Sequence, residues 1–336
     1  MERPRVLVVM PREVFAKVSR PGDMDLLRSF AEVVECLFDR EPSEGELAEL
    51  MADVDGCITS WGSPRITEGV LEGARRLRIV GHAAGSVKPY LCEEVFRRGI
   101  VVVHAAPLIA KSVAEFALAL ILVCLRDVLG HAEAAREGRW EYREAKPRVT
   151  RDLRGKTVGV VGFGYVGREV VKLLKPFDAR VLVYDPHVGE DVVRAHGAEP
   201  VPLDELLRES DVVTIHAALT EETYHMIGER ELRLMRPTAY LVNTARGAIV
   251  DTQALVRALR EGWIAGAALD VFEEEPLPRG HPLTELDNVV LTPHVAGPSD
   301  ERRSALFRAV VEDLMRFFRG EEPLYRISYE KLGFMA

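Results

Sequence analysis

Short apolar runs rich in β-branched residues alternate with amphipathic segments of helix length along almost the whole chain. This alternation is typical of β-α-β units, which build parallel sheets with helices on both faces. Eleven runs have strand character, which is more than one comfortable sheet holds, so the sequence predicts an α/β protein with two domains. The predicted strands are Val6–Met10, Val33–Phe38, Gly56–Ser60, Arg78–Gly81, Ile100–His104, Thr157–Val161, Arg180–Tyr184, Val212–His216, Ala239–Asn243, Ala265–Asp270 and Val289–Thr292.

The two groups of predicted strands are separated by a long helical stretch and a polar connector. The helical stretch covers about Ser112 to Glu137, and the connector from Gly138 to Gly155 has little apolar periodicity. A last helix is predicted from about Asp300, and the tail beyond Gly320 is predicted to be irregular. A C-terminal helix that folds back on the first group of strands would make that domain discontinuous.

Composition excludes several classes of protein. With 47% hydrophobic and 29% charged residues the chain is ordinary globular material, and its net charge of -9 disfavours a general nucleic-acid binder. The longest apolar stretch, Phe116 to Leu125, is shorter than the roughly 20 residues of a membrane span, so no membrane anchor is expected. Cys36, Cys57, Cys92 and Cys124 have neither metal-ligand nor redox spacing, which predicts reduced thiols, no metal site and a cytoplasmic location.

The strongest local motif is the glycine-rich run Gly162-Phe163-Gly164-Tyr165-Val166-Gly167, which lies between a predicted strand and a predicted helix. In a dinucleotide-binding fingerprint, the first glycine makes a tight turn and the second lets the backbone approach a pyrophosphate. The third lets the helix pack close to the strand, which places the phosphates on the helix N-terminus. Asp185 ends the next predicted strand, where an acid binds a ribose 2′-hydroxyl and repels a 2′-phosphate. The motif therefore predicts NAD as the cofactor, in preference to NADP.

Five segments of the chain resemble, in the same order along the sequence, motifs of the D-isomer-specific 2-hydroxyacid dehydrogenases. This family includes glyoxylate/hydroxypyruvate reductases and 3-phosphoglycerate dehydrogenases. The resemblance extends over about 6–324, and it implies two Rossmann-like domains with parallel sheets and an active site in the cleft between them. A flavodoxin-like substrate domain would comprise residues 1–108 plus 301–336, and an inserted NAD-binding domain residues 109–300. The helix near 112–126 would support a homodimer. The matching segments are Leu153–Gly167, His216–Thr223, Leu241–Asp251, Ala268–Pro276 and Thr292–His294.

Hydride transfer to a keto acid needs a cation for the carboxylate, an acid that supplies a proton, and a group that tunes this acid. Arg246, just after a predicted strand, has a planar fork that suits a carboxylate and an adjacent carbonyl oxygen. The resemblance makes Arg246 the substrate arginine of a reaction between NAD(H) and a small 2-hydroxy or 2-keto acid.

His294 follows Pro293 just after another predicted strand, and histidine can both give and take a proton near neutral pH. The resemblance makes His294 the general acid/base. It makes Glu275, the last glutamate before Pro276, the carboxylate that hydrogen-bonds His294 and favours its protonated form. The other histidines, His216 and His225 among them, have no such framing and are expected to be structural or surface residues.

The resemblance also implies further contacts. Tyr165 and Val166 would offer backbone N–H groups to the pyrophosphate, and Asp270 would lie beside the nicotinamide carboxamide and Arg246. Backbone amides of Gly85 and Ser86 in the first domain would meet the substrate carboxylate. The other predicted cofactor residues are Ala217, Ala218 and Thr223 on the adenosine and phosphate side, Thr244 near the nicotinamide, and Ala245, Arg246, His294 and Gly297.

Two positions depart from the family pattern. Ala218 stands where a proline is usual, and Lys88 stands where an aspartate or asparagine is common. We expect Lys88, together with His82, to bias the pocket toward a substrate with negative charge beyond the shared carboxylate. Two alternatives stay open at this point: a phosphoglycerate dehydrogenase, and a non-catalytic NAD(H)-sensing protein on the same fold.

Overall fold

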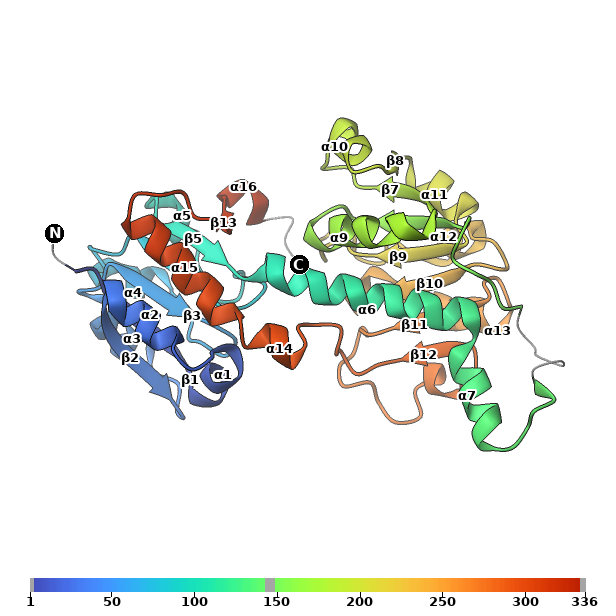
Figure 1. Cartoon of the computed structure of the whole chain (residues 1–336), viewed down its shortest axis with the longest axis horizontal. Helices are drawn as coiled ribbons and strands as arrows, with labels where there is room; N and C mark the ends of the chain where they lie inside the picture. The colour runs from blue at the N-terminus through green and yellow to red at the C-terminus, as the bar shows by residue number, and fades with distance from the viewer. Residues whose placement is uncertain (1–2, 143–148, 333–336) are drawn as a thin grey trace. The chain divides into compact units, whose positions relative to one another are not determined.

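The computed structural model describes residues 3–142 and 149–332. The chain divides into two compact units, the first of Met1–Ile109 with Pro298–Met335 and the second beginning at Ala110 and ending at Gly297. Each unit is a predominantly parallel sheet covered by helices on both faces, which confirms the predicted α/β class (Figure 1). Of the predicted polar connector, residues 143–148 lie outside the described part of the chain.

The sheet of the first unit consists of β1 (Arg5–Pro11), β2 (Glu32–Phe38), β3 (Gly56–Thr59), β4 (Ile79–His82), β5 (Val101–His104) and β13 (Arg326–Ile327). Their order is β13-β5-β4-β3-β1-β2, and the five strands from β1 to β5 follow the flavodoxin-like order. All neighbours are parallel except β13, which pairs antiparallel with β5. The sequence predicted parallel sheets, and the first sheet is parallel except for the two-residue strand β13.

Helices cover both faces of this sheet because alternate strand residues point to opposite sides. One apolar core lies under α3 (Glu44–Met51), α4 (Glu68–Gly73) and α5 (Glu94–Arg97). The opposite core lies under α1 (Arg12–Val18), α2 (Asp23–Phe30) and α15 (Leu306–Phe318). Figure 1 shows α15, from the end of the chain, beside α2 from its beginning, so this unit is discontinuous in sequence. Two short helices, α14 (Asp300–Arg303) and α16 (Tyr329–Leu332), complete it.

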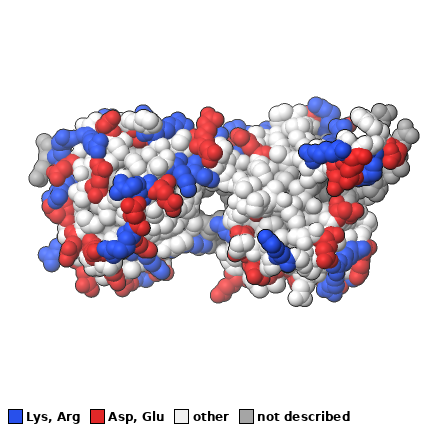
Figure 2. All heavy atoms as spheres, turned by 90° about the horizontal axis from the view of Figure 1, so that it is seen from below, with Lys and Arg blue, Asp and Glu red and all other residues white. Residues whose placement is uncertain are grey.

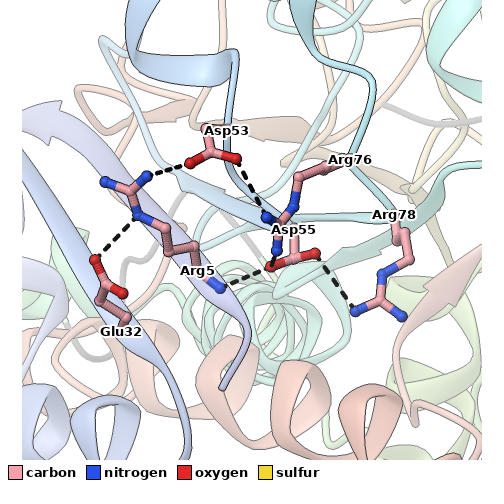
Figure 3. A network of polar contacts seen from close by, with 6 residues as sticks. All are labelled: Arg5, Glu32, Asp53, Asp55, Arg76 and Arg78. Carbon is pink, nitrogen blue, oxygen red and sulfur yellow. Dashed lines mark hydrogen bonds and ion pairs between the residues drawn. The ribbon is translucent and has the colours of Figure 1, made fainter. Parts of the chain in front are cut away.

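A network of charged side chains ties together the amino-terminal ends of four strands in the first unit (Figure 3). At its centre, the Asp55 carboxylate accepts a hydrogen bond from the Arg5 backbone N–H at 2.8 Å and pairs with Arg76 at 3.0 Å. The network lies at the amino-terminal ends of the strands, whereas the loop of residues 82–88 follows the carboxyl end of β4, on the opposite side of the sheet. The remaining members are Glu32, Asp53 and Arg78.

The sheet of the second unit consists of β6 (Thr157–Val161), β7 (Arg180–Tyr184), β8 (Glu199–Pro200), β9 (Val212–Ile215), β10 (Tyr240–Asn243), β11 (Gly266–Leu269) and β12 (Val289–Leu291). All pairs are parallel, in the order β12-β11-β10-β9-β6-β7-β8. The chain leaves β6 toward one edge and returns through β9 toward the other. Ligands of such sheets bind outside the carboxyl ends of the strands at this switch point.

One face of the second sheet is covered by α6 (Ala106–Arg126), α9 (Tyr165–Leu174) and α10 (Glu190–Ala195). The other face is covered by α11 (Leu203–Glu209), α12 (Glu229–Leu234) and α13 (Thr252–Arg260). A further helix, α7 (Val128–Arg136), follows α6. Short 3-10 turns are η1 (Lys175–Phe177), η2 (Gly247–Ile249) and η3 (Pro282–Glu285).

Helix α6 corrects two predictions. Among the described residues it is the one helix long and apolar enough to cross a membrane, so the apolar stretch is longer than Phe116–Leu125. The core helix of a soluble protein passes the same test, and Ala117, Ile121 and Leu125 of α6 pack in the core of the second unit. The predicted helical stretch also begins earlier than Ser112, at Ala106, and is broken at Asp127, whose φ is 47°.

All eleven predicted strands are present, and each end lies within one residue of its prediction. The missed strands, β8 and β13, have two residues each and therefore carry no periodicity. The tail beyond Gly320 is not irregular, since it forms β13 and α16, and the last helix is divided into α14 and α15.

Figure 2 shows basic and acidic side chains interspersed on the face that it presents.

Candidate active site

The predicted cofactor and catalytic residues of the second unit follow the carboxyl ends of β6, β7, β9, β10, β11 and β12. Most lie in loops, and Tyr165, Val166 and Gly167 form the first turn of α9. Because these strands are parallel, their carboxyl ends meet at one edge of the sheet. Residues more than a hundred positions apart in sequence are therefore brought to the same edge.

The glycine fingerprint has the close packing that its residue types predict. Gly162 has a φ of 94°, and a Cβ there would lie 2.5 Å from the backbone nitrogen of Ala217. A Cβ on Gly167 would lie 2.2 Å from the Gly162 carbonyl oxygen, so only glycine lets α9 start this close to β6. A Cβ on Gly164 would meet nothing within 4 Å, which leaves the open space that a pyrophosphate would occupy beside Tyr165 and Val166.

Asp185 follows β7 and is held by the backbone on both carboxylate oxygens. One oxygen accepts a hydrogen bond from the Phe163 N–H at 2.7 Å, and the other accepts from the His187 N–H at 2.9 Å. The first of these bonds ties the acid directly to the glycine loop. Each oxygen keeps lone pairs for a ribose hydroxyl. These hydrogen-bond acceptors fit the hydroxyls of the adenosine ribose of a nicotinamide dinucleotide.

The turn after β10 presents Arg246. Asn243 shapes this turn, because its side chain donates to the Arg246 carbonyl at 2.9 Å and accepts from the Ala245 N–H at 3.0 Å. Burial lowers the pKa of the Arg246 guanidinium and Glu275 opposes this effect, but arginine stays a cation in proteins. The buried Thr244 hydroxyl has no hydrogen-bond partner within the described residues, as expected for a group that meets a ligand.

The loops after β11 and β12 bring Glu275 and His294 together. Nδ1 of His294 lies 2.6 Å from Oε2 of Glu275, and Oε1 of Glu275 accepts the Phe272 N–H at 3.0 Å. Burial raises the pKa of Glu275, but the hydrogen bonds from His294 and Phe272 outweigh it and hold this pKa below its ordinary value. The carboxylate therefore fixes the imidazole through Nδ1, and half of the His294 side chain stays exposed.

His294 has a φ of 52°, a left-handed backbone conformation that costs a non-glycine residue about 1–3 kcal/mol. The fully buried carboxylate of Asp270 stabilises this loop, because it accepts the Val295 N–H at 2.9 Å and the Ala296 N–H at 2.8 Å. It also accepts the Thr292 hydroxyl at 2.6 Å. This support of the histidine loop by Asp270 is absent from the sequence prediction, in which Asp270 contacts the nicotinamide. The nicotinamide contact stays a prediction.

Gly247 is a further residue that the sequence reasoning missed. A Cβ on Gly247 would lie 1.9 Å from the Phe272 carbonyl carbon and 2.4 Å from the Glu273 nitrogen. The peptide before Glu273 therefore lies directly on the turn that carries Arg246. The signal in the sequence was the glycine that follows Arg246.

The loop after β9 contains the predicted adenosine-side residues. Thr223 donates its hydroxyl hydrogen to the Ala218 carbonyl at 2.6 Å and accepts the Thr220 N–H at 2.8 Å. These bonds shape the loop without the proline that is usual at position 218. Ala217 packs against Gly162, as noted above. Gly297 ends the second unit, and a Cβ there would meet nothing within 4 Å.

Gly85 and Ser86 lie in the first unit, in the loop after β4, and both are partly exposed. The Gly85 carbonyl lies 3.2 Å from Nδ1 of the buried His104. His82 is fully buried, and burial lowers its pKa to about 3, so it is neutral near pH 7. Burial therefore disfavours a positive charge on His82, and its expected influence on the substrate pocket stays a prediction. The roles of Gly85, Ser86 and Lys88 stay predictions.

Comparison with known proteins places these features in a family. Residues 118–296 match the model of the "D-isomer specific 2-hydroxyacid dehydrogenase, NAD binding domain". The chain is 41% identical over 331 residues to a glyoxylate reductase of Korarchaeum cryptofilum, covering 98% of this chain and 97% of the relative. It is 42% identical over 334 residues to a glyoxylate reductase of Aeropyrum pernix, with the same two coverages.

Solved structures show the same architecture. A protein of Pyrococcus horikoshii OT3 is 32% identical, with a TM-score of 0.82, and covers 98% of this chain and 97% of its own. A phosphoglycerate oxidoreductase of Rhizobium etli is 28% identical, with a TM-score of 0.84, and the match covers 97% of this chain and 99% of that one.

Proposed function

We propose that this chain, which belongs to the D-isomer-specific 2-hydroxyacid dehydrogenase family, reduces glyoxylate or a similarly small 2-keto acid with NADH. Membership makes it an oxidoreductase of 2-hydroxy and 2-keto acids that uses a nicotinamide dinucleotide. The glyoxylate reductases named above, at 41% and 42% identity, favour neither a phosphoglycerate dehydrogenase nor a non-catalytic sensor, and the phosphoglycerate oxidoreductase is less similar, at 28%. The observation that carries the proposal is the pairing of His294 with Glu275 at the strand edge that also presents Arg246.

In the proposed reaction, the guanidinium fork of Arg246 binds the substrate carboxylate and turns the carbonyl toward His294. Nε2 of protonated His294 donates its proton to the carbonyl oxygen as this oxygen becomes negative. Glu275 holds the imidazolium through Nδ1 during this step. The bound dinucleotide supplies the hydride. In the reverse direction, neutral His294 accepts the hydroxyl proton.

The function is tested by NADH consumption with glyoxylate, hydroxypyruvate, pyruvate, phosphohydroxypyruvate and bulkier 2-keto acids. We expect turnover to be fastest with glyoxylate or hydroxypyruvate. Preferred turnover of phosphohydroxypyruvate would instead support a phosphoglycerate dehydrogenase. Tight NADH binding without oxidation by any of these acids would contradict an enzymatic function.

The preference for NADH over NADPH is proposed from Asp185, whose anchored carboxylate would repel a 2′-phosphate. Asp185→Ser keeps a short hydrogen-bonding side chain without the charge, and we expect it to lower the NADH/NADPH ratio of kcat/KM about tenfold or more. The exposed Asp191→Ser serves as the charge-matched control on α10. An unchanged ratio in Asp185→Ser would remove Asp185 from this role.

We also propose a homodimer in the cytoplasm. The dimer is supported by exposed apolar side chains on α7, where Val128 is 45% and Leu129 is 52% exposed. Phe116, Leu118 and Leu122 on α6 pack against the core of the second unit and are also partly exposed. The cytoplasmic location is supported by four free cysteines.

A further inference from the structure

We propose that His225 and Glu273 are positioning residues, which hold the loop of Glu275 over the Arg246 turn and so keep the Glu275–His294 pair in its working geometry. The inference rests on the proposed function. From the sequence, neither residue has an expected role in the site: His225 is expected to be a structural or surface residue, and Glu273 is the first of three consecutive glutamates that end at Glu275.

The two side chains form a direct bridge between loops. Nε2 of His225 lies 3.0 Å from Oε2 of Glu273, and Oε1 of Glu273 accepts the Thr252 N–H at 2.8 Å. His225 is fixed from its own side, because its N–H donates to the Ala248 carbonyl at 2.9 Å. Tyr224 stacks on the His225 ring with a centroid distance of 4.0 Å and an angle of 15°. Glu273 is thus held by two partners from other segments, the loop of His225 and the first residue of α13.

The bridge acts where the backbone has little freedom. The peptide before Glu273 rests on Gly247, and His225 bonds to Ala248, so all three segments meet at the turn that follows Arg246. Glu275 comes two residues later and also accepts the Phe272 N–H. A shift at Glu273 is therefore transmitted within the same short loop to the carboxylate that holds His294.

The charges around this loop agree with the proposed division of roles. Burial raises the pKa of Glu273, but hydrogen bonds from Thr252 and His225 lower it overall, so the carboxylate stays ionised near neutral pH. Glu275 faces two other charged or titratable groups, His294 and Arg246, and both lower its pKa. Glu273 thus anchors the loop, and Glu275 orients the imidazole of His294. Glu274, between them, is exposed.

The pair also connects two parts of the site. His225 ends the segment that contains Ala217 and Thr223, which are predicted to contact the adenosine side, whereas Glu273 belongs to the loop of the acid/base pair. Loss of the bridge should disturb the orientation of Glu275 more than the binding of NADH, because the glycine loop and Asp185 have contacts of their own. Misplacement of catalytic groups by about 1 Å can cost on the order of a hundredfold in rate.

The test compares His225→Leu, which removes the hydrogen bond, with His225→Gln, which keeps a donor near the position of Nε2. Both replacements have a similar energetic cost at the φ of 51° that His225 adopts. The difference in kcat between the two variants therefore reports the effect of the hydrogen bond to Glu273. We expect kcat of His225→Leu to fall about tenfold and that of His225→Gln to stay within about twofold of the wild type. The Kd for NADH should stay within about twofold in both.

A pH profile supplies a readout that a merely structural role would not move. The Glu275 carboxylate is present above its lowered pKa and is lost as the pH falls through it. If His225→Leu loosens the loop, this pKa moves up toward its ordinary 4.5, and the acidic limb of kcat moves to higher pH with it. Glu274→Gln removes one charge from the same loop and should leave both kcat and the limb unchanged.

Three results would overturn the inference. The first is a wild-type kcat in His225→Leu, and the second is an acidic limb of kcat that does not move in this variant. The third is a lowered melting temperature in both His225→Leu and His225→Gln, with kcat lost in both. The wild type is assayed in parallel. An inactive wild type would overturn the proposed function, whereas an active wild type with unaffected variants overturns only the role of His225 and Glu273.

Discussion

His294→Asn is expected to lower kcat for 2-keto acid reduction by about a thousandfold, because asparagine can neither hold nor release a proton near neutral pH. Asparagine tolerates the left-handed backbone better than most residues, and His294 has a φ of 52°, so the loop should keep its shape. NADH binding should change by no more than about twofold, since the glycine fingerprint is untouched. The measurements are kcat from NADH consumption and the Kd for NADH from its fluorescence.

The matched control is His281→Asn, the same exchange at a partly exposed histidine that caps η3, where asparagine can also cap, and that takes no part in the proposed site. It should retain the kcat of the wild type. Near-normal turnover in His294→Asn would contradict the role of His294, whatever the control shows. Loss of NADH binding together with turnover would point to damage of the fold instead.

The sequence predicted the strands well because buried parallel strands form near-continuous apolar runs, and such runs are bounded by glycine, proline and polar residues. Thr157–Val161 and Arg180–Tyr184 were predicted to the residue. β13 could not be predicted, since a two-residue strand is defined by its partner β5 and not by any local pattern. The early start of α6 at Ala106 was missed because its first five residues, 106–110, are all apolar and include Pro107, so they carry no amphipathic periodicity.

In the candidate site, residue types indicated which groups would gather, but not how they are held. The pairing of Glu275 with His294 was expected from the resemblance, and the structure brings the two side chains within hydrogen-bond distance. The support of the histidine loop by Asp270 depends on backbone N–H groups that carry no signal in the sequence. The glycine at position 247 is visible in the sequence, but the reason for it appears only in the structure, where the Phe272 carbonyl group lies beside it.

Arg246→Leu is expected to lower kcat/KM for the keto acid by roughly a hundred- to ten-thousandfold, because two hydrogen bonds to a carboxylate contribute about 1.5–3 kcal/mol each. Arg246→Lys should recover only part of this loss, since an ammonium keeps the charge but not the planar fork. The loss should appear mainly as a higher KM for the keto acid, with the Kd for NADH nearly constant. Steady-state kinetics over a range of keto acid concentrations separates the change in KM from any change in kcat.

The same variants predict a pH effect with a definite sign. Arg246 helps to lower the pKa of Glu275, so Arg246→Leu should raise that pKa toward 4.5, and the acidic limb of kcat/KM should move to higher pH. Arg246→Lys should leave the limb near its wild-type position because the charge remains. Arg260→Leu, at a half-exposed arginine on α13 that pairs with Glu285, is the control and should show neither effect. Retention of kcat/KM within about threefold in Arg246→Leu would exclude Arg246 as the substrate cation, because a single hydrogen bond to a charged group contributes more than that.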